Sequence, residues 1–118
     1  MKRDMDKVRG VMLALEAKTG PFVLTYDTPS MGGTDDGAET VEYIVLLHSG
    51  GFLESTQRNV YRLSWAGHEF LDSVRDPEIW RQTKDGAAKI GSWSITLLGE
   101  LAKGFLRAKA ASLGLPIG

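Results

Sequence analysis

The chain has 118 residues, 42% of them hydrophobic, a length that fits a single compact domain. It has no cysteine, which excludes disulfides and thiolate chemistry, and its net charge of −1 differs from the strongly basic surface of a dedicated nucleic-acid-binding protein. No apolar run approaches the roughly 18 residues of a membrane span, and no signal-peptide pattern follows the charged start. We therefore expect a cytoplasmic protein without membrane contact.

Apolar side chains near the start recur at helical spacing and predict a first helix over residues 2–18. These positions are Met5, Val8, Met12 and Leu15. Gly20-Pro21 should end the helix, because proline cannot continue the hydrogen-bond ladder. The short, aromatic and β-branched segment 22–26 predicts an edge strand.

Residues 27–37 are rich in Pro, Ser, Gly, Thr and Asp, which predicts a loop held by turn chemistry rather than by packing. A second helix is expected over residues 39–48, with Gly50-Gly51 as its stop signal. Its apolar stripe should contain Val41, Ile44, Val45 and either Leu47 or His48.

A hairpin should follow, with Phe52 and Leu53 entering the core and a polar turn over residues 54–59. Alternation beyond the turn predicts that Tyr61, Leu63 and Trp65 face the interior of a half-buried strand.

Three capping signals predict the starts of the remaining helices. Ser64, Asp76 and Ser94 each supply a side-chain oxygen that can accept from first-turn amides. The last helix should reach about Ser112. Its stripe of Leu98, Leu101 and Phe105 should either pack on the rest of the chain or form a homodimer through residues 94–112.

This order of elements predicts an α+β fold, namely a winged helix-turn-helix-like domain with a small antiparallel sheet and additional C-terminal helices. Residues 1–75 would form the winged-helix domain. Residues 76–118 would form a helical extension that packs on it or dimerises, within one structural domain overall. The loop at 27–37 replaces a helix that many winged helices possess.

Three segments carry a family resemblance: the opening MKRDMDKVR of residues 1–9, the step from Leu46-Leu47 to Gly51-Phe52-Leu53, and RLSWAGHEFLD of residues 62–72. Together they resemble the uncharacterised bacterial and phage domain-of-unknown-function family 2513, from residue 1 to about residue 107. The resemblance implies a winged-helix-like domain and frequent association with phages and mobile elements, with no established activity to carry over. The loop over residues 28–37 looks longer than the resemblance implies.

A nucleic-acid surface would use the helix at 39–48 as reader and the hairpin turn, residues 55–62, as a wing with cations near phosphate. The DNA-binding candidates are Gln57, Arg58, Asn59 and Arg62 in the wing and Lys2, Arg3 and Lys7 on the first helix. If the first and last helices lay side by side, a seven-cation patch would add Arg9, Lys103, Arg107 and Lys109. Solvated faces are the commoner explanation for the same residues.

The charge distribution opposes the reader role. Residues 19–57 carry six acidic side chains and no lysine or arginine. Acids at the start of the reader helix complement its dipole but would repel phosphate. The protein-interaction candidates are Asp35, Asp36, Glu39, Glu42, Tyr43 and Trp93, the last because it lies outside any apolar stripe.

Neither His48 nor His68 has metal-ligand spacing, and no nucleophile motif occurs, so we expect no enzyme, no cofactor and no metal site. Together with the family resemblance, these observations predict a non-enzymatic, phage- or mobile-element-associated protein that acts by protein–protein interaction, as a regulator or inhibitor of a host factor. The alternative is a DNA-binding winged-helix transcriptional regulator.

Overall fold

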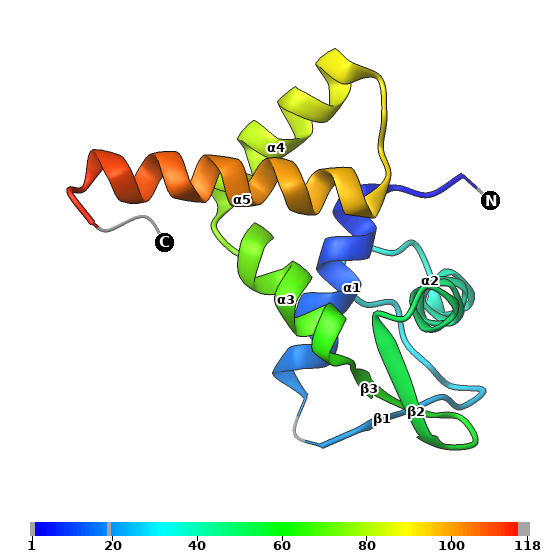
Figure 1. Ribbon diagram of the computed structural model, residues 1–118. Helices are drawn as coiled ribbons and strands as arrows, with labels where there is room; N and C mark the ends of the chain where they lie inside the picture. Colours follow the sequence, from blue (N-terminus) through cyan, green and yellow to red (C-terminus); the bar gives the residue numbers. More distant parts are fainter. Residues whose placement is uncertain (1, 19, 116–118) are drawn as a thin grey trace. The chain divides into compact units, whose positions relative to one another are not determined.

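The computed structural model describes residues 2–18 and 20–115. In this part of the chain, five helices and one three-stranded antiparallel sheet form an α+β structure (Figure 1). The chain divides into two compact units, Met1–Leu71 and Asp72–Gly118, and the division falls within helix α3. The expected boundary between residues 75 and 76 remains a prediction.

Helix α1, Met5–Ala17, confirms the first predicted helix. Asp4 is its N-cap and accepts a hydrogen bond from the Asp6 amide at 2.9 Å. All four predicted apolar positions are buried, together with Val11. Lys2 and Arg3, which were expected on this helix, precede it and are exposed.

The sheet has the order β1-β3-β2 and belongs to the first unit. Its strands are β1 (Phe22–Val23), β2 (Leu53–Gln57) and β3 (Val60–Leu63), so the predicted edge position of β1 is confirmed. The turn between β2 and β3 is shorter than expected and contains only Arg58 and Asn59. Asn59 adopts a φ of 62°, a left-handed conformation that asparagine tolerates better than most residues.

The loop between β1 and α2 is packed, which corrects the expectation that turn chemistry alone holds it. Thr28, Met31 and Thr34 are buried. The hydroxyl oxygens of Thr34 and Thr40 lie 2.7 Å apart, and the Met31 amide donates to the Thr34 hydroxyl at 2.9 Å. A short polar loop becomes compact here because threonine hydroxyls satisfy its buried backbone groups.

Two glycines allow this loop to lie directly on α1. A Cβ added to Gly10 would come closer than 3.0 Å to the carbonyl group of Gly32, and Gly32 itself has a φ of 62°. Only glycine fits both demands, because it has no Cβ and adopts positive φ at low cost. The contact fixes the path of the loop and hence the start of α2.

Helix α2, Gly37–Ser49, begins at the N-cap Asp36 and ends at Gly50-Gly51, as predicted for its stop. One side packs against α1 and β2 (Figure 1). Its buried residues are Thr40, Tyr43, Ile44 and Leu47. The predicted stripe was therefore wrong for Val45, which is exposed, whereas of the alternatives Leu47 and His48 it is Leu47 that is buried. The helix is rotated so that Tyr43 enters the core, where its hydroxyl accepts from the Asp4 amide at 2.9 Å.

Strand β3 ends at Leu63, and helix α3, Trp65–Val74, starts two residues later. Ser64 caps it as predicted, because its hydroxyl accepts from the Gly67 amide at 3.1 Å. The expectation that Trp65 faces the core was wrong, since 81% of it is exposed. The alternation stops at Leu63, and the next periodicity is that of a helix. Phe70 is buried, and its ring packs edge-on against Phe52 at 6.1 Å.

The second unit contains helices α4 (Pro77–Ile90) and α5 (Ile95–Ser112), which pack on each other. Asp76 and Ser94 are their N-caps, as predicted. Gly86 of α4 faces Leu101 and Phe105 of α5, so the apolar stripe of α5 packs within the chain. A homodimer through residues 94–112 remains a prediction.

Candidate functional site

Helix α2 has an exposed side that carries aliphatic residues. Val45 is 50% exposed and Leu46 is 41% exposed. Residues on this side share one helical face, which we call the α2 outer face; its members are Ala38, Glu42, Val45, Leu46 and Ser49. No lysine or arginine occurs anywhere in α2. The outer face therefore combines exposed aliphatic side chains with one carboxylate, that of Glu42.

The acidic start of α2 has a cation partner from α1. The Lys7 ammonium lies 2.7 Å from a Glu39 carboxylate oxygen and 3.5 Å from Asp35, and the Lys7 side chain is only 20% exposed. The hydrogen bond with Glu39 raises the pKa of Lys7, and the same bond, with the Asp35 amide, lowers the pKa of Glu39. Both groups are held in their charged forms. The acids that remain exposed are Asp35, Asp36 and Glu42.

This pair changes the predicted roles of two residues. Lys7 was a DNA-binding candidate, but its ammonium is engaged with two carboxylates and is not a free cation for phosphate. Glu39 was a protein-interaction candidate, but its carboxylate is half-buried in the pair. The sequence of residues 19–57 suggested an acidic block without a compensating cation, but Lys7 from α1 supplies one. Asp36 also has a structural task, since it accepts from the Glu39 amide at 2.8 Å.

The two aromatic interaction candidates differ in exposure. Tyr43 is only 1% exposed, so it contributes no side-chain surface to a partner, which corrects its prediction. Trp93 lies between α4 and α5 and is exposed.

In the hairpin, the predicted wing residues are also unequal. Arg62 pairs with Glu54 across the two strands, with its Nε 2.7 Å from the carboxylate. Gln57, just before the turn, and Asn59, within it, are exposed. Arg58 is exposed at the turn, and no ion pair of this side chain occurs within the part of the chain that the structure describes. Of the two hairpin arginines predicted to bind DNA, Arg62 is therefore paired within the described residues and Arg58 is not.

The seven-cation patch would draw on both units and remains a prediction. Lys7 and Lys109 have acidic partners within their own unit. Lys7 contacts Glu39, and Lys109 lies 2.6 Å from Asp76. Lys103 and Arg107 are exposed on α5.

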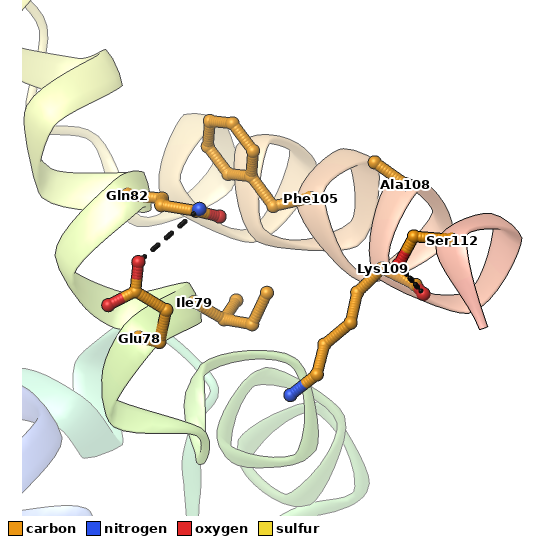
Figure 2. A pocket seen from close by; sticks show the side chains of 7 residues that line it. All are labelled: Glu78, Ile79, Gln82, Phe105, Ala108, Lys109 and Ser112. Carbon is orange, nitrogen blue, oxygen red and sulfur yellow. Dashed lines mark hydrogen bonds between the residues drawn. The ribbon is translucent and has the colours of Figure 1, made fainter.

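The second unit has a groove of about 420 Å³ between α4 and α5 (Figure 2). Its lining residues are Glu78, Ile79, Gln82, Phe105, Ala108, Lys109 and Ser112. The charged groups at its rim are already paired: Glu78 with Arg81, which lowers the pKa of Glu78, and Lys109 with Asp76. The groove is therefore lined partly by apolar side chains, and its two charged lining residues, Glu78 and Lys109, are both in ion pairs.

Neither histidine belongs to the α2 outer face, and each has its own neighbour. The His48 ring packs edge-on against Tyr61 at 5.2 Å, and His68 Nδ1 lies 3.9 Å from Glu16. Across residues 2–18 and 20–115, no three His, Asp or Glu side chains gather as metal ligands would. In the same ranges, no helix has the length and apolar character to span a membrane.

Residues 2–94 match the domain-of-unknown-function family 2513 (DUF2513), which is described as a hypothetical protein. The chain belongs to this family. An uncharacterised protein of Haemophilus influenzae is 33% identical over 94 residues, which cover 71% of this chain and 76% of that protein. No solved structure matches. The DUF2513 match ends at Ser94, the N-cap of α5, whereas the resemblance was expected to reach about residue 107.

Proposed function

We propose that this DUF2513 protein is a non-enzymatic, phage- or mobile-element-associated protein that binds another protein through the α2 outer face, as a regulator or inhibitor of a host factor. The observation that carries the proposal is the pairing of exposed Val45 and Leu46 with Glu42 on a helix without lysine or arginine. Interfaces between proteins combine apolar contacts with polar groups, and the outer face offers both.

The same observation disfavours groove docking by α2. Phosphate contacts by lysine and arginine supply most of the affinity that lets a helix approach DNA. Lys7, the cation nearest the start of α2, is already paired with Glu39. The exposed carboxylates of Asp35, Asp36 and Glu42 favour a partner with basic residues around an apolar contact, because complementary charges speed association and orient the partner.

The experiment is affinity capture from lysate of the native host with matched surface variants. Leu46→Lys places a cation in the α2 outer face, and Leu113→Lys makes the same change at an exposed position in the other unit. We expect Leu46→Lys to lose a specific protein that wild type and Leu113→Lys retain. Glu42→Lys should weaken the same capture. Retention of that protein by Leu46→Lys at wild-type level would refute the proposal.

A second candidate function, a DNA-binding winged-helix transcriptional regulator, is favoured by Arg58. This residue is exposed at the hairpin turn beside Asn59, the geometry that a wing needs near phosphate. Fluorescence anisotropy with random duplex DNA at low salt tests it. Arg58→Ala should weaken binding more than Arg62→Ala, because Arg62 is paired with Glu54. The candidate is lost if wild type binds no DNA or if Arg58→Ala binds equally well.

A further inference from the structure

Trp65 is the largest exposed apolar side chain among the described residues of the first unit. It is 81% exposed, although it is the first residue of a helix and follows the buried Leu63 by only two positions. Most of the apolar surface of this indole is therefore in contact with water. Tryptophan is among the residue types that most often dominate the binding energy of protein interfaces.

Hydrogen bonds of Ser64, the residue before Trp65, connect the start of α3 to the turn that follows α2. The Ser64 hydroxyl donates to the Gly51 carbonyl at 2.5 Å, and the Ser64 amide donates to the Phe52 carbonyl at 3.0 Å. The Gly50 amide in turn donates to the Leu46 carbonyl at 3.0 Å. Trp65 thus follows a residue that is bonded to the turn after α2, and the same turn is bonded to the backbone of Leu46. A standard interface covers about 800 Å² on each partner, enough to include both positions.

The charges near Trp65 have the same sign as those of the α2 outer face. Glu69, one helical turn after Trp65, is exposed, and the ten residues of α3 contain no lysine or arginine. Glu42 is the carboxylate of the α2 outer face. Both helices therefore present an exposed carboxylate and an exposed apolar side chain, Glu69 with Trp65 on α3 and Glu42 with Leu46 on α2.

We propose that Trp65 is the anchor of the α2 interface and inserts into an apolar pocket of a protein partner whose rim carries lysine or arginine. This inference rests on the proposed function. A second copy of the chain fits less well, because two-fold pairing of this face would bring Glu42 and Glu69 of both copies together. Stacking on a nucleic-acid base fits less well too, since these exposed carboxylates repel phosphate.

Photo-crosslinking in native host cells tests the proposal, with benzoylphenylalanine placed singly at positions 46, 65 and 26. Tyr26 is a fully exposed aromatic residue outside both helices and is the matched control. We expect positions 46 and 65 to crosslink the same protein and position 26 to crosslink none of it. With that protein purified, Trp65→Ala should weaken binding about 30-fold, as for an anchor residue, while Tyr26→Ala should bind like wild type.

The outcomes separate the two proposals. If position 46 crosslinks a protein that Trp65→Ala binds as tightly as wild type does, the anchor role is refuted and the α2 interface stands. If neither position crosslinks a protein, both proposals fail. Crosslinking of position 65 to a second copy of this chain, or to nucleic acid, would also overturn the assignment. Trp65→Ala should keep the wild-type melting temperature, which shows that a loss of binding is not a loss of folding.

Discussion

The contact between Gly10 and Gly32 gives a sharp test of how α2 is positioned. In an ordinary helix, Gly→Ala stabilises by about 1 kcal/mol, because alanine has the higher helix propensity. At Gly10 the new Cβ would overlap the carbonyl of Gly32, whose loop is held by the buried Met31 and Thr34 and cannot simply withdraw. Overpacking of this kind costs typically 1–3 kcal/mol and sometimes more.

We therefore expect Gly10→Ala to lower the free energy of unfolding by about 1–2 kcal/mol, despite its gain in helix propensity. Gly104→Ala is the matched control. Gly104 lies within α5, and a Cβ there would meet no atom within 4 Å, so the same substitution should stabilise by up to about 1 kcal/mol. Urea unfolding followed by circular dichroism measures both changes.

The reasoning is refuted if Gly10→Ala is as stable as wild type or more so. That result would mean that the loop gives way freely, and the loop could not then fix the start of α2. A lowered stability of Gly104→Ala would instead contradict the open surroundings of that position.

Three further predictions concern packing and charge. Trp65→Ala should change the free energy of unfolding by less than about 0.5 kcal/mol because the side chain is exposed, whereas Trp80→Ala should cost about 3–5 kcal/mol because that side chain is buried; thermal unfolding compares them. Tyr43→Phe should cost about 1 kcal/mol in urea unfolding through loss of its hydrogen bond to the main chain, and an unchanged midpoint would contradict this role. Hydrogen bonds from Lys109 and from two backbone amides lower the pKa of Asp76. Its stabilising contribution is therefore complete above its unfolded pKa of about 3.9 and is lost as the pH falls through the lower folded value. Asp76→Asn should accordingly reduce the acid-induced loss of stability, and an acid limb identical to that of wild type would refute the assignment.

Local signals in the sequence predicted the elements well. Ser64, Asp76 and Ser94 each cap a helix in the structure, and the spacing of apolar residues in α1 matches its buried side. Capping and periodicity depend on residues a few positions apart, so one sequence contains all the information they need.

Features that depend on tertiary contacts were not predictable in the same way. Spacing alone placed the stripe of α2 on Val45, whereas the structure buries Tyr43, whose hydroxyl accepts from the amide of Asp4, 39 residues away. The pair of Lys7 and Glu39 spans 32 residues and has no local signal. Trp65 does have a local signal: it directly follows the N-cap Ser64, so it begins a helix and leaves the strand alternation.

Chemical-shift mapping by NMR tests the central claim most directly, that the α2 outer face binds a protein. The ¹⁵N-labelled protein is titrated with the purified partner captured by wild type and, separately, with random duplex DNA. We predict that the partner shifts the amide signals of residues 38–49 and the Trp65 indole signal, and that DNA leaves them unchanged. The account is contradicted if the partner leaves α2 unperturbed, or if DNA shifts the α2 signals.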